Sequence, residues 1–181
     1  MKSSGSVVLI LSLVVSVLSG CASKRQMMDA ASSAAPSVVF LVRHAEKVDS
    51  SRDPELSEAG KVRAKTLADV LRSADIDYIH SSDYIRTRDT ARPLALVTGL
   101  EIALYDPGDL PTIAETVKTT PGRHLVVGHS NTTPQLAALL GGESGPEINE
   151  ANEYDRLYIL TIGKNGAVSS VIMRYGVKYQ P

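Results

Sequence analysis

The sequence predicts an α/β fold: a layered α/β/α sandwich around a mostly parallel central sheet, with a C-terminal β-hairpin. Two observations lead to this fold class. Between residues 37 and 142, short runs rich in Val, Ile and Leu alternate with stretches of helical periodicity, which is typical of parallel strands joined by helices. The last two apolar runs, 154–162 and 167–175, are separated only by Gly-Lys-Asn-Gly, a turn sequence that favours a hairpin.

The predicted strands and helices alternate from the first residue of the domain. The first strand, 37–42, is apolar throughout, as expected of a strand buried on both faces. The helix after it, 56–73, has Ser57 as its candidate N-cap and an apolar stripe of Val62, Leu67, Val70 and Leu71. The remaining elements are a strand at 76–81, a helix at 86–99 closed by Gly99, a strand at 101–105, a helix at 109–120 capped by Asp109 or Thr112, a strand at 124–128 and a helix at 132–142 with Pro134 in its first turn.

The beginning of the chain is expected to lie outside this fold. Residues 1–20 have the pattern of an export signal, with a cation at Lys2, an apolar stretch from Val7 to Leu18 and then small residues. The apolar stretch is shorter than the roughly 20 residues that a membrane-spanning helix needs. The signal ends in Leu-Ser-Gly followed by Cys21, the only cysteine in the chain. This ending resembles the bacterial lipobox, which implies that Cys21 is acylated and becomes the first residue.

The resemblance to lipoproteins also implies a location. An aspartate after the lipidated cysteine favours retention in the inner membrane of Gram-negative bacteria, and this chain has Ala22 instead. We therefore expect a lipid anchor in the cell envelope, on the periplasmic face of the outer membrane. Residues 21–36 are small and polar and should form a flexible tether. Residues 37–181, about 145 residues, are then enough for one domain.

The charge balance argues against nucleic acid as a partner. Without the signal the chain has 18 basic and 20 acidic residues, a net charge of −2. Charges of both signs alternate along 61–75, whereas a nucleic-acid-binding protein is expected to collect Lys and Arg on one face.

Polar residues with catalytic potential follow four of the predicted strands. Arg43 and His44 come directly after the first strand and His129 after the fourth; Arg86 begins the helix behind the second, and Asp106 follows the third. In open α/β sheets, ligands bind beyond the carboxyl ends of the strands, so these side chains should meet at one rim.

These residue types suit a phosphoryl group. Arginine offers a planar fork of donors that matches two phosphoryl oxygens and stays charged. A neutral imidazole is a nucleophile near pH 7, so one histidine can take the phosphoryl group and pass it to water. The second histidine can donate a hydrogen bond to the same oxygens, and a carboxylic acid can protonate the leaving group.

Three segments carry a family resemblance. LVRHAEK, SSDYIRTRDTA and VVGHSN resemble, in order and spacing, the signatures of the histidine phosphatase superfamily in its phosphoglycerate-mutase-like branch, and the resemblance covers residues 37–175. It implies that His44 is the phosphorylated histidine, that Arg43 and Arg86 bind phosphate and that His129 is the second histidine. The compact length also resembles the small bacterial phosphohistidine phosphatases.

The proton donor is left open. Asp106 is the favoured candidate, Asp109 has a competing role as a helix cap, and a mechanism without a carboxylic acid is the third possibility, as in the small phosphohistidine phosphatases. Among the other polar residues, we expect His80 and His124 to be structural and Arg88 to form a salt bridge or face solvent. Glu46 and Lys47 could line the pocket mouth, begin a helix or form ion pairs.

The function expected from sequence is metal-independent hydrolysis of a phosphorylated small molecule or a phosphohistidine protein, without a cofactor. A metal hydrolase using His44, His129 and Asp106 as ligands is less favoured, because two arginines would oppose metal binding and neither an HxH nor an HExxH spacing is present. Mutase activity, and phosphate binding without turnover by a lipoprotein of this fold, are two further hypotheses. Substrate choice should depend on the loops at 48–55, 106–112 and 143–153.

Overall fold

The computed structural model describes residues 36–180. The predicted signal peptide, the lipidation site Cys21 and the tether up to residue 35 lie outside the described residues, so those interpretations stay predictions. None of the helices within 36–180 has both the length and the apolar composition that crossing a membrane requires.

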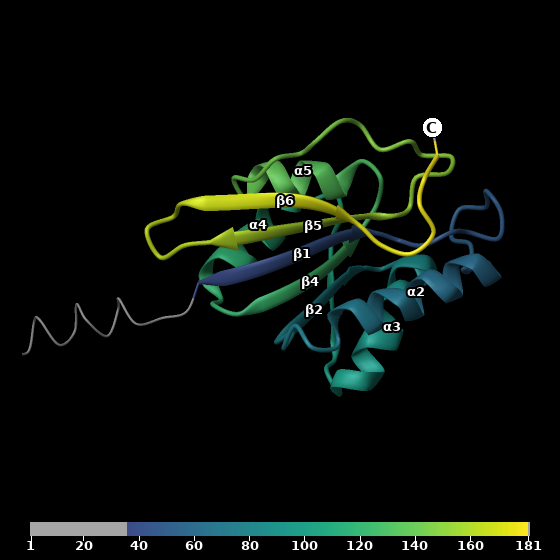
Figure 1. The fold of residues 1–181 in the computed structure, drawn as a ribbon, viewed down its shortest axis with the longest axis horizontal. Helices are drawn as coiled ribbons and strands as arrows, with labels where there is room; N and C mark the ends of the chain where they lie inside the picture. Colours follow the sequence, from purple (N-terminus) through teal and green to yellow (C-terminus); the bar gives the residue numbers. More distant parts are fainter. Residues whose placement is uncertain (1–35, 181) are drawn as a thin grey trace, which may run out of the picture. The chain divides into compact units, whose positions relative to one another are not determined.

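One six-stranded mixed sheet organises the domain, with the strand order β3-β2-β4-β1-β5-β6. The first four strands in this order are parallel to one another, and β5 and β6 add an antiparallel hairpin beside β1 (Figure 1). The strands are β1 (Ser37–Arg43), β2 (Tyr78–Ser82), β3 (Ile102–Tyr105), β4 (Arg123–Gly128), β5 (Arg156–Ile162) and β6 (Val168–Arg174). The predicted parallel sheet and hairpin are therefore confirmed.

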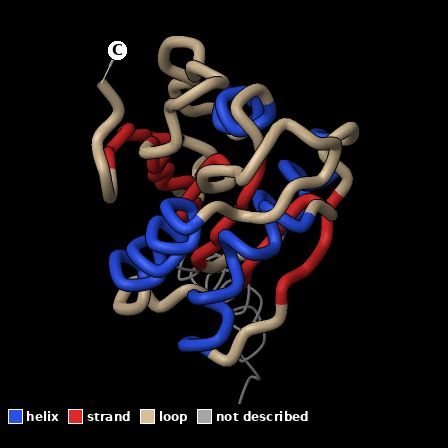
Figure 2. Tube along the Cα trace, turned by 90° about the vertical axis from the view of Figure 1, so that its right-hand side faces the viewer, coloured by secondary structure: helices blue, strands red, loops and turns tan. Residues whose placement is uncertain are grey.

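Helices cover both faces of this sheet, as the sandwich prediction requires. They are α2 (Glu58–Leu71), α3 (Ile85–Thr98), α4 (Leu110–Thr119) and α5 (Thr132–Leu139). Alternate residues of β1 point to opposite faces: Val39 and Leu41 join a core with α4 and α5, and Phe40 and Val42 join a core with α2 and α3. Figures 1 and 2 show the two helix pairs on opposite sides of the strands.

Most of the predicted helix ends are confirmed. The Ser57 hydroxyl accepts a hydrogen bond from the amide of Gly60 at 3.2 Å and caps α2. Asp109, rather than Thr112, caps α4, because its carboxylate accepts from the amide of Thr112 at 3.3 Å. Gly99 closes α3 with a φ of 72°, a left-handed conformation that a residue without a Cβ adopts easily.

The predicted apolar stripe of α2 is only half right. Leu67 and Leu71 are buried, but Val62 and Val70 are 60% and 50% exposed. The buried face of the helix runs instead through its small residues and one charged residue, namely Gly60, Arg63, Ala64, Leu67, Ala68 and Leu71. Because α2 packs closely against α3, small side chains are needed there and the two valines are turned outward.

Candidate active site

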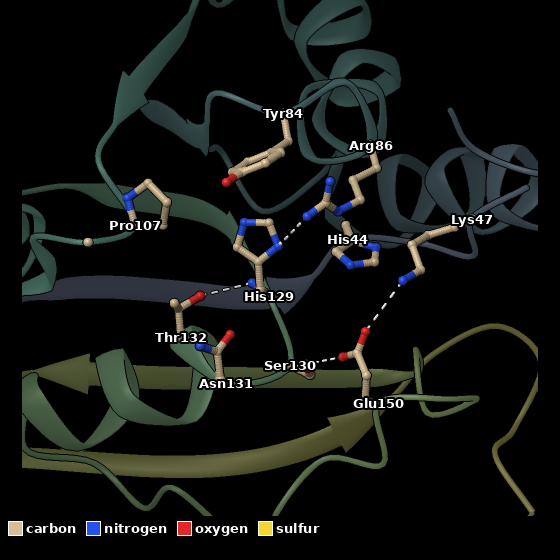
Figure 3. A pocket seen from close by; sticks show the side chains of 11 residues that line it. His44, Lys47, Tyr84, Arg86, Pro107, His129, Ser130, Asn131, Thr132 and Glu150 are labelled. Atoms are coloured by element: carbon tan, nitrogen blue, oxygen red, sulfur yellow. Dashed lines mark hydrogen bonds and ion pairs between the residues drawn. The ribbon is translucent and has the colours of Figure 1, made fainter. Parts of the chain in front are cut away.

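A pocket of about 490 Å³ opens at the carboxyl ends of β1 and β4 (Figure 3). Its walls come from four parts of the chain: the segment after β1, the start of α3, the loop after β3 and the segment after β4, with one residue from the loop before β5. The lining residues are His44, Lys47, Tyr84, Arg86, Pro107, Gly108, His129, Ser130, Asn131, Thr132 and Glu150. The pocket lies where the sequence predicted it, beyond the carboxyl ends of the parallel strands. Three of the predicted site residues, His44, Arg86 and His129, line it.

His44 is held as a neutral imidazole with one ring nitrogen free. Its backbone amide continues the β1–β4 pairing by donating to the carbonyl of Gly128 at 2.9 Å. Its Nδ1 lies 2.7 Å from the carbonyl oxygen of Ala45, so Nδ1 carries the proton and Nε2 keeps its lone pair. Burial lowers the pKa of His44 to about 2, and the charge of Arg43 acts in the same direction. The side chain is therefore an unprotonated imidazole at neutral pH.

Arg86 reaches into the pocket from the first turn of α3. Its guanidinium lies 4.3 Å from the centre of the Tyr84 ring, and its Nη1 forms a 3.4 Å ion pair with Asp53. Asp53 also accepts a hydrogen bond from the amide of Ile85, so one carboxylate holds both the helix start and the arginine. The Nη2 group donates to Nδ1 of His129 at 3.4 Å, as Figure 3 shows.

His129 lies opposite His44, with the ring centres 5.6 Å apart. Its backbone amide donates to the Thr132 hydroxyl at 2.9 Å, which ties the histidine to the start of α5. Burial lowers its pKa to about 4, with a further contribution from the charge of Arg86. Both pocket histidines are consequently neutral near pH 7.

Arg43 lies beneath the pocket rather than in its lining. The guanidinium is 1% exposed and stacks on the Tyr154 ring at 4.1 Å. Its Nη groups donate to the backbone carbonyls of Asn149, Glu150 and Glu153 at 3.1, 2.6 and 2.9 Å. The arginine that sequence assigned to phosphate thus also fastens the loop before β5.

Two buried arginine donors, one in the pocket lining and one beneath it, have no partner in the described part of the protein. Within residues 36–180, the Nε atoms of Arg43 and Arg86 are both buried and have no hydrogen-bond partner in the protein. A buried N–H without an acceptor is costly, and a phosphoryl group has the oxygens to satisfy such donors. Tyr175 contributes the one other unpartnered buried atom of this kind in that part of the chain.

Glu150 is a charged pocket residue that the sequence analysis did not single out, although it lies in the loop at 143–153 that was expected to influence substrate choice. Its carboxylate pairs with Nη2 of Arg43 at 2.8 Å and with Nζ of Lys47 at 3.4 Å, and it accepts from the Ser130 hydroxyl. Burial raises its pKa, but the Ser130 hydrogen bond and the two cations outweigh burial and leave the pKa below its ordinary value. Glu150 is therefore ionised at neutral pH and a poor proton donor. It comes from an irregular loop with no periodicity or motif to mark it.

The structure does not bring Asp106 together with the histidines. Its carboxylate accepts from the amide of Gly108 at 2.8 Å and so closes the turn after β3. It lines a neighbouring hollow with Arg52 and Asp83, while Pro107 and Gly108 line the pocket itself. Its assignment as the general acid stays a prediction, one that this placement does not support.

The residues expected to be structural have structural partners. His80 Nε2 and His124 Nδ1 lie 3.1 Å apart, away from the pocket, and His124 Nε2 lies 2.8 Å from the carbonyl of Thr120. Arg88 forms a salt bridge with Asp83.

Of the two residues with several possible roles, Lys47 lines the pocket and Glu46 forms an ion pair. The Glu46 carboxylate accepts from Nε and Nη2 of Arg63 at 2.9 and 2.8 Å. Arg63 also donates to the carbonyls of Tyr175 and Val177, so this pair connects the first motif to the C-terminal segment.

The pocket at this parallel sheet edge brings together two neutral histidines and the guanidinium of Arg86, with Arg43 buried beneath it. Such an arrangement can bind an anion and offers an imidazole that can act as a nucleophile. Comparison with known proteins agrees. Residues 39–107 match the family model "Histidine phosphatase superfamily (branch 1)". This match spans less than half of the chain, includes the first two of the three sequence signatures and agrees with the resemblance that they carry.

Relatives with curated names match over part of their length. The "Probable phosphoglycerate mutase GpmB" of Photorhabdus laumondii is 38% identical over 73 residues, 36% of this chain and 34% of that protein. "Phosphoserine phosphatase 1" of Hydrogenobacter thermophilus is 40% identical over 75 residues, 38% of this chain and 36% of that protein. The chain thus spans about a third of the length of these relatives.

Solved structures support the fold over a longer range. The protein histidine phosphatase SixA, complexed with tungstate, superimposes with a TM-score of 0.60 at 17% identity, covering 76% of this chain and 96% of that one. A mycobacterial glucosyl-3-phosphoglycerate phosphatase gives a TM-score of 0.57 at 19% identity, covering 76% and 97%. At these identities the likeness establishes the phosphoglycerate-mutase-like fold alone.

Proposed function

We propose that this protein is a metal-independent phosphatase that hydrolyses phosphomonoesters or phosphohistidine through a phosphohistidine intermediate on His44. The observation that carries the proposal is the state of His44. Its Nδ1–H is bound to the Ala45 carbonyl, so the Nε2 lone pair is the reactive atom beside the positive charge of Arg86.

The reaction has two steps. In the first, Nε2 of His44 forms a bond to phosphorus, and the bond between phosphorus and the leaving group breaks with its electron pair on the leaving group. In the second, water forms the new P–O bond, the P–N bond breaks, and its electron pair returns to Nε2. Arg86 and Arg43 neutralise the phosphoryl oxygens in both steps, which is the role a metal ion has in many other phosphatases.

The carboxyl groups around the pocket determine whether a leaving group can receive a proton as it departs. Glu150 is the one carboxyl side chain in the lining, and its pKa is lowered, while Asp106 faces the neighbouring hollow. An alkoxide is strongly basic and needs a proton to depart, whereas an imidazole needs less help. The site therefore favours phosphohistidine, or esters with acidic leaving groups, over alkyl phosphates. A protein carrying phosphohistidine is the partner that fits this preference.

Trapping the intermediate tests the proposal. The wild-type protein mixed with a ³²P-labelled phosphodonor and quenched in base should carry an acid-labile, base-stable label, and His44→Ala should not. His80→Gln is the matched control, because it replaces a buried histidine outside the pocket and should keep the label. Label retained at full level on His44→Ala would refute the assignment. No label on the wild type would favour a binding protein without turnover.

Mutase activity is the second candidate, because one relative is named as a phosphoglycerate mutase. A mutase returns the phosphoryl group to a substrate hydroxyl, whereas a phosphatase gives it to water. We expect labelled inorganic phosphate to be the product when a phosphoglycerate is supplied with the labelled enzyme. Label in a phosphoglycerate isomer would establish the mutase instead.

We further propose that the protein is lipidated on Cys21 and held at the periplasmic face of the outer membrane. The proposal rests on the lipobox-like ending of the signal and on Ala22. Expressed in a Gram-negative host, the wild type should be labelled by a tagged fatty acid and sediment with outer membranes. Cys21→Ser should lose the label and be mislocalised. A wild type that is unlabelled and soluble would rule out the anchor.

A further inference from the structure

A short chain of hydrogen bonds runs from His129 into the core. The Nε2 atom of His129 lies 2.9 Å from the hydroxyl oxygen of Ser82, at the end of β2. The Ser82 hydroxyl in turn lies 3.1 Å from the hydroxyl oxygen of Thr87, in the first turn of α3. Thr87 completes the chain by donating to the backbone carbonyl of Ser82 at 2.7 Å. Ser82 and Thr87 are both fully buried, so water cannot substitute for these partners.

Counting hydrogens along this chain fixes the tautomer of His129. Each hydroxyl has one hydrogen to donate. The hydrogen of Thr87 is directed to a backbone carbonyl, which cannot donate in return, so Thr87 must accept from Ser82. The hydrogen of Ser82 is then committed to Thr87, and Ser82 can only accept from His129. The proton of the neutral His129 ring therefore lies on Nε2.

The other ring nitrogen is consequently an acceptor. Nδ1 of His129 has a lone pair, and Nη2 of Arg86 donates to it at 3.4 Å. Because Arg86 and His129 both line the pocket, this lone pair lies beside the phosphoryl site (Figure 3). The neutral ring can take a proton there but cannot donate one from Nδ1.

We propose that Ser82 and Thr87 are positioning residues that hold His129 in the Nε2–H tautomer, so that its Nδ1 accepts the proton of the attacking water. This inference rests on the proposed function. When water attacks the phosphohistidine, its oxygen bonds to phosphorus and the P–N bond breaks with its electron pair returning to Nε2 of His44. Nη2 of Arg86 turns from Nδ1 of His129 to a phosphoryl oxygen, and one water proton moves to the Nδ1 lone pair that this frees. The resulting imidazolium returns this proton to solvent or to the departing phosphate, which restores the neutral ring.

The charges around His129 fit this role. Burial is the main cause that disfavours the imidazolium; the charges of Arg86, Arg43 and Lys47 act in the same direction, and Glu150 opposes them. The neutral ring is thus ready to accept a proton in the resting enzyme. A phosphoryl group beside the ring adds negative charge, which stabilises the imidazolium while the proton is held.

The tautomer can be measured without any assay of activity. Nitrogen-15 NMR of the ring, with the signal assigned by its loss in His129→Gln, should show the proton on Nε2 in the wild type at pH 7.5. Ser82→Ala should give a mixture of tautomers. Thr87→Val should shift the population toward Nδ1–H, because the Ser82 hydroxyl, having lost its acceptor, can donate to Nε2. A wild-type ring protonated on Nδ1 would overturn the proposal.

Rates of the two chemical steps provide the second test. With nitrophenyl phosphate, whose leaving group needs no proton, Ser82→Ala should form the phosphoenzyme within about twofold of the wild-type rate and hydrolyse it about 10-fold more slowly. Ser81→Ala is the matched control, since Ser81 is an equally buried serine of β2 whose hydroxyl donates to a backbone carbonyl. It should leave both rates unchanged.

The outcomes separate the two proposals. Unchanged dephosphorylation in Ser82→Ala with a redistributed tautomer would refute the role of Nδ1 as proton acceptor. Absence of any phosphoenzyme on the wild type would refute the proposed function, whatever the tautomer. If Ser82→Ala does not fold, Thr87→Val and the wild-type spectrum still decide the question.

Discussion

Lowering the pH should destabilise the domain through its buried histidine pair. His80 and His124 are 7% and 0% exposed, and Nε2 of His80 shares a hydrogen bond with Nδ1 of His124 at 3.1 Å. Burial lowers the pKa of His80 to about 4, and the neighbouring His124 acts in the same direction. The unfolded chain has an ordinary histidine pKa of about 6.5 and binds the proton first.

The sign and size of the effect follow from these pKa values. The contribution of a histidine whose pKa is lowered by folding is complete above about pH 6.5 and is lost as the pH falls toward 4. At pH 5 the unfolded form of one such residue is almost fully protonated and the folded form is not, which costs about 2 kcal/mol for His80 alone.

Chemical denaturation at a series of pH values measures this loss. The purified protein should lose stability in urea between pH 7 and pH 5, as followed by circular dichroism. His80→Gln keeps a side-chain N–H that can donate to His124 but does not titrate, so its pH dependence should be smaller by about 2 kcal/mol over this range. Equal pH dependence in the two proteins would show that His80 does not stay neutral in the fold.

Three further results are expected. Glu150→Gln should strengthen competitive inhibition by inorganic phosphate about 3- to 10-fold, because it removes the anion that competes for the pocket cations; an unchanged inhibition constant would contradict this. Gly60→Ala should lower the free energy of unfolding by about 2 to 4 kcal/mol, because a Cβ there would overlap the backbone of Glu46, whose nitrogen would be only 3.0 Å away. Calorimetry would measure this loss of stability, and an undiminished melting temperature would count against this packing. Asp106→Asn should slow hydrolysis of alkyl and nitrophenyl phosphates equally and by less than about 3-fold. A selective loss of rate with the alkyl ester, together with loss of the high-pH limb of the pH–rate profile, would instead make Asp106 the general acid.

Sequence reasoning located the parts of the site that depend on strand ends. His44, Arg86 and His129 were predicted to meet because apolar runs mark the strands and parallel strands end at one edge. The hairpin and the caps at Ser57 and Asp109 were equally readable, since they depend on local turn and capping chemistry.

The contacts that the sequence did not predict depend on the direction of a side chain or on long loops. Glu150 reaches Arg43 across 107 positions of the chain, and no periodic pattern connects them. Asp106 does follow the end of β3, but its carboxylate accepts from the amide of Gly108. Val62 fitted a helical stripe, yet close packing of α2 on α3 requires smaller residues.

The hydrogen bonds from Arg43 to the loop before β5 have a consequence for how the sequence of this loop can diverge. Besides the Glu150 carboxylate, Arg43 has three acceptors in that loop, at Asn149, Glu150 and Glu153, and these are backbone carbonyl oxygens, which every amino acid provides. The exposed side chain of Glu150 can therefore be exchanged while the arginine keeps its backbone anchorage, whereas the buried carboxylate of Glu153 is bound to Arg156 and Arg174. A new substrate preference could be acquired on this rim by substitution in one loop, with the reactive imidazole and its charged surroundings inherited unchanged.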